Sequence, residues 1–360
     1  MNSLSSVRAK VCAGERLSND DALCLFASDE LAEIGEMAAW ANERKNGRRV
    51  FFNVNRHLNY TNICVNRCRF CAFRRDADEQ GAYLLDTAEI RSLAEDALLR
   101  GATEIHMVGG LHPSLPFEAY QEMLRTVKSV SPRLHLKAFT AVEIDHMARV
   151  SGLCLHEVFQ RLGDAGLDSM PGGGAEIFAP SVRTQLCGDK ISGERWLEIM
   201  EHAHGCGLRS NATMLYGHRE SHADRVDHLS RLRDLQDRTG GFQAFVALPF
   251  QPGDTPLKQE GTRAPGGVDD LKTIAVARLF LDNFAHIKAY WVMLGERIAQ
   301  VALTFGADDL DGTVVEEKIG HEAGADSPPG MERQHLVRLI RAAGRDPVER
   351  DSFYNEVRNS

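Results

Sequence analysis

Three cysteines lie close together in this chain, in the C-x3-C-x2-C arrangement Cys64, Cys68 and Cys71. Phe70 immediately precedes the last of them, and the next cysteine downstream is Cys154. A structural zinc site usually takes four ligands in two separated pairs, so this spacing argues against a four-cysteine zinc site. A redox C-x-x-C pair would leave Cys64 unexplained. Three thiolates without a fourth in reach favour an iron–sulfur cluster that keeps one coordination position open, as a catalytic cluster requires.

Two histidines and five further cysteines are the other potential metal ligands. His57 or His106 could complete a zinc site with the cysteine triplet, but neither has the spacing of a zinc ligand. The remaining cysteines are scattered, and we interpret them as buried thiols: Cys12, Cys24, Cys154, Cys187 and Cys206. Eight cysteines in a chain of 360 residues do not indicate a disulfide framework, and they fit a reducing compartment.

The elements that must position the triplet follow a regular rhythm. Beyond residue 49, short apolar or β-branched runs alternate with Gly- or Pro-marked loops and helical patterns. This alternation predicts an α/β fold, a (β/α)8-type TIM barrel of parallel strands, with an open doubly wound sheet as the alternative. We expect an N-terminal helical extension over 1–49, the barrel over 50–350 and a C-terminal tail over 351–360. The predicted strands are 50–55, 104–108, 135–140, 167–170, 209–215, 242–248, 287–294 and, with the weakest pattern, 310–315.

In such a barrel, chemistry lies on the loops that follow the C-terminal ends of the strands. The first of these loops carries the cysteine triplet, the second carries Gly109 and Gly110, and the third carries Glu143. The fourth is the glycine-rich stretch 171–176, and no Lys-Ser or Lys-Thr follows it, which excludes a P-loop. A tight turn would also explain the paired glycines, and a helix N-terminus would also explain Glu143. The chemically informative residues nevertheless all fall on one predicted rim.

The overall composition restricts the class of partner. Hydrophobic residues make up 43% of the chain and charged residues 26%, which is ordinary for a protein with a sizeable core. The formal net charge of −9 argues against a nucleic-acid partner, because there is no basic excess to displace counterions from phosphates. A small anionic substrate remains compatible with this charge, since local basic residues can dominate a pocket. The chain shows no apolar signal segment and no membrane span, so we expect a cytoplasmic protein.

The triplet and the rim together resemble the radical S-adenosylmethionine superfamily. That resemblance implies a 4Fe-4S cluster held by Cys64, Cys68 and Cys71, whose fourth iron is open to S-adenosylmethionine as a co-substrate. It further implies a low-potential electron donor of the flavodoxin or ferredoxin type. The acidic residue that usually follows the two glycines is replaced here by Leu111. The residues that the resemblance assigns to S-adenosylmethionine binding are Phe70, Gly109, Gly110, Glu143, Glu176 and Arg183.

Longer stretches are similar to one subgroup, which contains two enzymes of the futalosine route to menaquinone and the enzymes that build the deazaflavin chromophore. These stretches are HLNYTNIC (57–64), GGLHP (109–113), KAFTAVE (137–143), PGGGAEI (171–177) and NATM (211–214). The stretches MLYGH (214–218) and IKAYWVMLG (287–295) most resemble the aminodeoxyfutalosine synthase family. The alternatives are the hydrogen-abstracting dehypoxanthine futalosine cyclase, a deazaflavin chromophore synthase component and a non-catalytic iron–sulfur electron carrier.

The resemblance to the synthase family implies a transferase with a small anionic aromatic substrate. The 5′-deoxyadenosyl radical would add to 3-(1-carboxyvinyloxy)benzoate, and aryl migration with loss of bicarbonate would give aminodeoxyfutalosine. Two substrate carboxylates should require cationic or hydrogen-bonding groups, and an aryl ring could stack on an aromatic side chain. The candidates for these contacts are His112, His218, Arg219, Lys288, Tyr290 and Trp291. Each of them would also be explained as a surface charge or a core aromatic.

Overall fold

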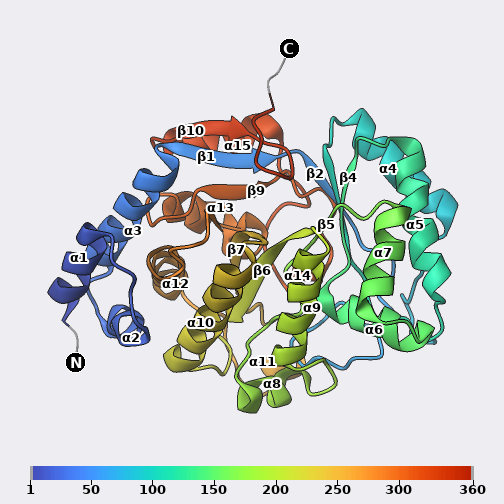
Figure 1. Cartoon of the computed structure of the whole chain (residues 1–360), viewed down its shortest axis with the longest axis horizontal. Helices are drawn as coiled ribbons and strands as arrows, with labels where there is room; N and C mark the ends of the chain where they lie inside the picture. The colour runs from blue at the N-terminus through green and yellow to red at the C-terminus, as the bar shows by residue number, and fades with distance from the viewer. Residues whose placement is uncertain (1–2, 358–360) are drawn as a thin grey trace.

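The computed structural model describes residues 3–357, and its chain begins with three helices (Figure 1). These are α1 (Leu4–Ala13), α2 (Asn19–Ala27) and α3 (Leu31–Asn46). Ser18 caps α2 through a reciprocal capping box with Asp21. The Lys45 ammonium at the end of α3 donates to the carbonyls of Asp282 and Phe284, which ties this helical extension to the rest of the fold.

Ten parallel strands form one sheet in the order β10-β1-β9-β8-β7-β6-β5-β4-β3-β2. Their bounds are β1 Arg49–Asn53, β2 Asn55–Leu58, β3 Glu104–Met107, β4 His135–Ala138, β5 Ser169–Met170, β6 Arg209–Tyr216, β7 Phe242–Pro249, β8 His286–Lys288, β9 Asp309–Gly312 and β10 Asp346–Glu349. The strands that pair longest are β6 and β7, from Ser210 against Phe242 to Tyr216 against Pro249. Because the strands run parallel, all their C-terminal ends meet at one rim.

The two ends of this sheet come together. Strands β1 and β2 follow each other directly, with only Val54 between them; β1 pairs with β9 and β2 pairs with β3. A parallel bridge joins Arg56 to Val315, just beyond β9, and the amide of His57 donates to the Val315 carbonyl over 2.9 Å. The sheet therefore returns upon itself, and the predicted (β/α)8-type barrel is confirmed. Strand β10 pairs with β1 on the outside of this barrel.

Helices cover the outside of the barrel and connect its strands (Figure 1). The longest is α10, which begins after a capping box between Ser221 and Asp224 and ends at Gly240 in the left-handed conformation. The helices after β2 are α4 Thr87–Leu99, α5 Phe117–Val130, α6 Ala141–Ser151, α7 Leu155–Ala165, α8 Pro180–Cys187, α9 Gly193–Gly205, α10 His222–Thr239, α11 Pro256–Gln259, α12 Gly267–Phe280, α13 Trp291–Ala302, α14 Ile319–Glu322 and α15 Arg333–Ala342. Among residues 3–357, no helix combines the length and apolar character needed to span a membrane.

The chain beyond β10 covers the end of the barrel opposite the rim. The Arg350 guanidinium donates to the Asp309 carboxylate over 2.8 Å, and both side chains are buried. The Ser352 hydroxyl donates to the Glu104 carboxylate over 2.6 Å, at the first residue of β3. The barrel floor is therefore closed by charged and polar contacts.

Two sequence expectations were wrong in detail, and one strand was missed. The predicted strand 287–294 ends at Lys288, and helix α13 begins at Trp291, because a short apolar run fits a buried helix as well as a strand. Strand β10, which carries a proline at the sheet edge, was not predicted. The cysteines that are exposed rather than buried are Cys12, Cys154 and Cys206.

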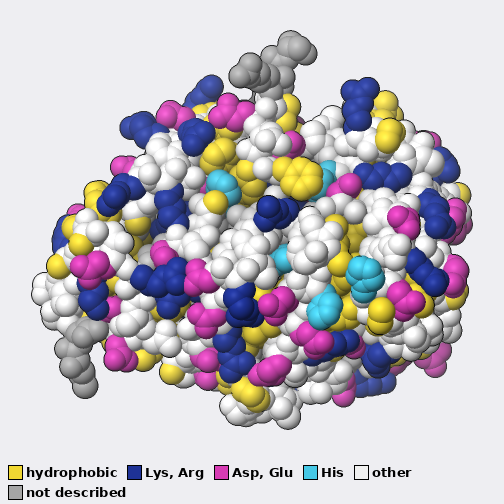
Figure 2. Space-filling model, in the orientation of Figure 1, with side chains coloured by type: hydrophobic (Ala, Val, Ile, Leu, Met, Phe, Trp, Pro, Cys, Tyr) yellow, Lys and Arg dark blue, Asp and Glu magenta, His cyan; other side chains and the backbone are white. Residues whose placement is uncertain are grey.

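Acidic and basic side chains are interspersed over the face of the molecule shown in Figure 2. Exposed ion pairs occur in the described chain: Arg238, for example, lies 3.1 Å from Glu201.

Candidate active site

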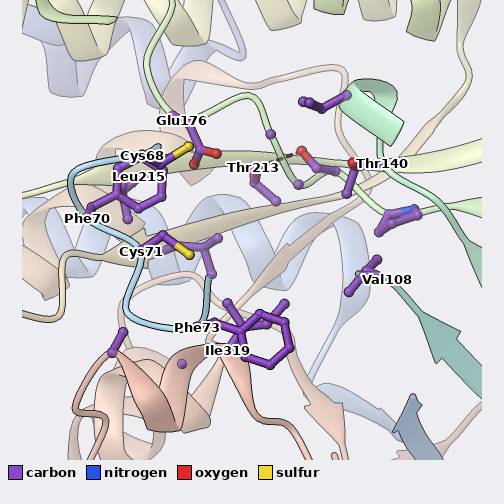
Figure 3. A pocket seen from close by; sticks show the side chains of 18 of the residues that line it. Cys68, Phe70, Cys71, Phe73, Val108, Thr140, Glu176, Thr213, Leu215 and Ile319 are labelled. Carbon is purple, nitrogen blue, oxygen red and sulfur yellow. Dashed lines mark hydrogen bonds between the residues drawn. The ribbon is translucent and has the colours of Figure 1, made fainter. Parts of the chain in front are cut away.

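A cavity of about 310 Å³ lies at the rim, inside the C-terminal ends of the strands (Figure 3). Loops from four successive strand ends contribute to its wall, as the sequence predicted for the chemically informative residues. Of the candidate residues, those that line it are Cys64, Cys68, Phe70, Cys71, Gly109, Gly110, Glu143, Glu176 and Tyr290. The barrel therefore brings the cysteine triplet, the paired glycines and the two carboxylates to one cavity.

Backbone hydrogen bonds fix the loop that carries the cysteines. The Val65 amide donates to the Leu111 carbonyl over 3.0 Å, which joins this loop to the segment after Gly110. The Arg69 amide donates to the Leu186 carbonyl over 2.8 Å, which joins it to α8. These two bonds anchor the loop, through its backbone, to two other parts of the rim.

The donor set fits an iron–sulfur cluster. All three cysteines carry free thiols, and burial raises the pKa of both the Cys68 and the Cys71 thiol. Buried thiolates need a compensating positive charge, which a metal centre supplies on binding. In the described part of the chain, no three His, Cys, Asp or Glu side chains converge as ligands of a single ion. An iron–sulfur cluster does not require its cysteine ligands to converge on one ion, because each cysteine sulfur binds a different iron.

Gly109 and Gly110 are required by close packing. A Cβ atom on Gly109 would lie 2.7 Å from the Tyr60 ring, and one on Gly110 would lie 2.3 Å from the Ile63 carbonyl oxygen. The Gly110 amide donates to the Thr61 carbonyl over 2.9 Å. Because neither residue carries a side chain, the segment after β3 can pack directly against the start of the cysteine loop.

Glu143 is both a helix cap and a wall of the cavity. One carboxylate oxygen, Oε2, accepts from the Thr140 amide over 2.7 Å and from the Thr140 hydroxyl over 2.8 Å, which completes the capping box of α6. The other, Oε1, accepts from the Tyr60 hydroxyl over 2.7 Å and from the Gly109 amide over 3.1 Å. Burial raises the pKa of Glu143, and these four hydrogen bonds oppose that rise.

Glu176 lies beside Cys68 at the cysteine end of the cavity (Figure 3). Its backbone has a φ of 47°, a left-handed conformation that non-glycine residues seldom adopt outside functional sites. The Lys190 ammonium lies 2.5 Å from its carboxylate and 5.2 Å from the centre of the Phe70 ring. Sequence reasoning missed Lys190, which sits beyond α8 and reaches the cavity only in the folded chain.

Arg183 does not line the cavity. Its guanidinium donates to the carbonyls of Gly174, Ala175 and Ile177 over 3.0, 2.6 and 3.2 Å, and the side chain is buried. It therefore holds the glycine-rich loop from behind and does not face the space in front of it.

Five of the six candidate substrate contacts also lie outside the cavity wall; Tyr290 alone among the six lines it. Lys288 is buried behind it in an ion pair with Asp311. Trp291 is fully buried, and its indole N–H donates to the Gly312 carbonyl over 2.9 Å. His218 pairs with Glu220, Arg219 contacts Gln185 and Glu260, and the His112 ring accepts from the Ser114 amide.

Polar residues that sequence reasoning did not assign to the substrate form the lower wall. They are His57, His106, Asn211, Asp311 and Glu317. A signal for them existed, because each of the first four is a polar residue on a strand whose side chains face the barrel interior. A polar residue directed into a barrel requires a partner or a ligand.

Comparison with known proteins gives the family. Residues 58–232 match the Radical SAM superfamily, and residues 239–359 match the CofH/MqnC C-terminal region. Among solved structures, methylornithine synthase shares the fold, with a TM-score of 0.75 at 19% identity over 95% of this chain and 97% of that chain. The chain belongs to the radical SAM superfamily and is a radical SAM enzyme. Membership implies a 4Fe-4S cluster, S-adenosylmethionine and a reductant.

Several curated relatives match over most of the chain. The aminodeoxyfutalosine synthase of Thermus thermophilus is 46% identical over 99% of this chain and 96% of that protein. The 5-amino-6-(D-ribitylamino)uracil–L-tyrosine 4-hydroxyphenyl transferase of Methanopyrus kandleri is 44% identical over 87% of this chain and 85% of that protein. The cyclic dehypoxanthine futalosine synthase of Streptomyces coelicolor is 38% identical over 98% of this chain and 89% of that protein.

Proposed function

We propose that this protein is an aminodeoxyfutalosine synthase of menaquinone biosynthesis. In the proposed reaction, the 5′ carbon of the adenosyl group bonds to the vinyl carbon of 3-(1-carboxyvinyloxy)benzoate. The aryl group would then migrate, and the carboxyl group would leave with the unpaired electron. That electron would return to the oxidised cluster, and water would add to the resulting carbon dioxide to give bicarbonate. The observation that carries this proposal is the likeness, over nearly the whole chain, to relatives of that name. The cavity next to the cysteine triplet supports the radical chemistry that the proposal requires.

Cys64, Cys68 and Cys71 would hold the cluster through their thiolates. Once bound, the cluster supplies the electron that cleaves S-adenosylmethionine. Backbone hydrogen bonds from Val65 and Arg69 anchor the loop that carries these residues. Lys190 would favour the thiolate form of Cys68, because its ammonium charge acts on that sulfur. An electron donor of the flavodoxin or ferredoxin type would complete the system.

Glu143 and Glu176 would bind the co-substrate. The Glu143 carboxylate already accepts four hydrogen bonds, from Thr140, Tyr60 and Gly109, so a ribose hydroxyl would bind it by replacing one of these donors. Glu176, already neutralised by Lys190, would accept from a polar group of the methionine part. Phe70 would pack against the adenine.

The rest of the cavity wall would protect the reactive carbon. Val108, Leu215, Val246 and Leu248 line part of it with aliphatic side chains, which would exclude water from the reacting atoms. A volume of about 310 Å³ lies at the lower end of the range for small-molecule sites. Such a space would hold the alkene against the 5′ carbon, and that contact is what favours addition over abstraction of a hydrogen atom.

A choice of substrates tests the proposal. The anaerobically reconstituted protein is given dithionite, S-adenosylmethionine and one of three substrate sets, and the products are identified by mass. The sets are 3-(1-carboxyvinyloxy)benzoate, dehypoxanthine futalosine, and ribitylaminouracil with tyrosine. We expect aminodeoxyfutalosine from the first set alone. Turnover confined to either of the other sets would refute the proposal and would assign the chain to the activity of the corresponding relative.

A further inference from the structure

Two histidine side chains in the lower wall of the cavity lack hydrogen-bond partners. His57 on β2 and His106 on β3 stand opposite each other in the strand register, and their ring centres lie 4.4 Å apart at 33°. The Nε2 of His57 is buried without a partner, whereas the ring of His106 is half-buried and borders the cavity. A buried imidazole nitrogen normally has a partner, so His57 is incomplete without a ligand, and His106 offers that ligand a second imidazole.

The charges around this histidine pair are already balanced. The Lys137 ammonium on β4 lies 2.7 Å from the Glu104 carboxylate on β3, and Lys288 on β8 pairs with Asp311 on β9. Despite burial, these cations hold the pKa of Glu104 and the pKa of Asp311 below their usual values.

The loop after β9 adds one more balanced pair. Glu317 faces His57, and it accepts from the Gly320 amide over 3.0 Å and contacts His321 over 3.3 Å. The hydrogen bond to Glu317 raises the pKa of His321 to about 9, so this imidazole is charged at neutral pH. Each acid near the histidine pair therefore has its own base. Burial lowers the pKa of both His57 and His106, which leaves the pair neutral.

The histidine pair lies at the deep end of the cavity. His106 precedes the rim residue Gly109 by three positions, so it stands about 10 Å further down the barrel. Tyr290 and Asn211 line the same cavity, and neither side chain hydrogen-bonds to another described residue. Tyr290 lies close to Asp311 and Glu317, the acids that also face His57. The deep end thus offers a ring, an amide and two imidazoles to a ligand.

We propose that His57 and His106 form the subsite for the aromatic carboxylate of the substrate, and that they take up one proton when it binds. This inference rests on the proposed function. The alkene must contact the 5′ carbon near the rim, so the carboxylate on the far side of the ring reaches the deep end. There, an imidazole N–H donates to a carboxylate oxygen.

Proton uptake follows from the charge balance. The acids and bases around His57 and His106 already compensate one another, so a bound carboxylate would add an unpaired negative charge to a buried site. Burying an unpaired charge is costly, and protonating one imidazole removes that cost. The complex would therefore bind one proton more than the free enzyme and free ligand near pH 7.

Calorimetry on the reconstituted enzyme with S-adenosylmethionine and no reductant tests the proposal. The probe is 3-(1-carboxyvinyloxy)benzoate, titrated in two buffers of different ionisation enthalpy. We expect uptake of about one proton near pH 7.5, and affinity that falls as the pH rises. The corresponding benzamide, which carries no aromatic charge, should bind without proton uptake. His57→Gln and His106→Gln should each weaken binding of the probe by about 10- to 100-fold and lose the proton uptake.

The outcomes separate the two proposals. Equal proton uptake with the benzoate and the benzamide on the unaltered enzyme would overturn the subsite, whether or not the variants fold. So would a folded His57→Gln protein that binds the benzoate with unchanged affinity and unchanged proton uptake. An unaltered enzyme that neither binds nor converts the benzoate would instead overturn the proposed function, and the subsite with it.

Discussion

The hydroxyl of Tyr60 should determine the pH below which S-adenosylmethionine binding weakens. It donates to Glu143 Oε1 over 2.7 Å, inside a site where burial already raises the pKa of that carboxyl group. Tyr60→Phe removes this donor and keeps the ring that packs on Gly109. The pKa of Glu143 should therefore rise further, because one of the hydrogen bonds that favour its charged form is gone.

The size of the effect follows from the geometry. A hydrogen bond to a charged acceptor contributes about 1.5–3 kcal/mol, and one pKa unit corresponds to about 1.4 kcal/mol. The pKa of Glu143 should therefore rise by about 1–2 units in Tyr60→Phe. Because the folded-state pKa is raised relative to the unfolded chain, stability is lost as pH rises through it. The variant should lose about 1.5–3 kcal/mol of unfolding free energy at neutral pH, and less in acid, where Glu143 is protonated.

Two measurements check this prediction. The dissociation constant of S-adenosylmethionine is measured against pH for the reconstituted protein, and the unfolding free energy is measured in urea. Tyr120→Phe is the matched control, because Tyr120 packs edge-on against Tyr60 at 5.9 Å and its hydroxyl makes no hydrogen bond with another described residue. In the control, the affinity for S-adenosylmethionine should fall at the same pH as in the unaltered protein. If the affinity of Tyr60→Phe also falls at that pH, Glu143 does not bind the co-substrate in its charged form.

Three further predictions concern the metal loop and the buried ion pairs. Cys68→Ala should lose cluster iron and cleavage of S-adenosylmethionine together, while circular dichroism shows an unchanged fold; retained cleavage would refute its role. Lys288→Met should cost about 3–5 kcal/mol in urea unfolding near pH 7, because it leaves the buried Asp311 charge unpaired, and Lys288→Arg should cost less. His321→Gln should lose stability mainly below about pH 6.5, since the raised pKa of about 9 makes the contribution of His321 fade as pH rises through that value. A stability difference that does not vary between pH 6 and pH 10 would contradict this assignment.

The barrel and its rim could be predicted because their signals are local. Alternating strand and helix patterns define the fold, and the cysteine spacing defines a metal loop within eight residues. Glu143 was found because it follows a predicted strand and because the stretch KAFTAVE (137–143) resembles the family, whereas its capping role was the competing explanation.

The rest depended on contacts between residues far apart in the chain. The sequence shows that Lys288 is charged, but the fold decides that Asp311 pairs with it behind the cavity wall. Trp291 was expected to stack on a substrate ring, yet it starts a helix and points its N–H at the Gly312 carbonyl. His57 and His106 become neighbours only when β2 and β3 pair. Such pairings require the register of the sheet, which a single sequence does not fix.

The fate of the adenosyl carbon tests the central claim most directly. S-adenosylmethionine carrying ¹³C throughout its adenosine is supplied with 3-(1-carboxyvinyloxy)benzoate under anaerobic reduction, and the label is followed by mass. The account predicts that the labelled adenosine carbons appear in a product that also contains the aryl ring, with little labelled 5′-deoxyadenosine. Release of labelled 5′-deoxyadenosine in equal amount to the substrate consumed would show hydrogen abstraction and would contradict the account.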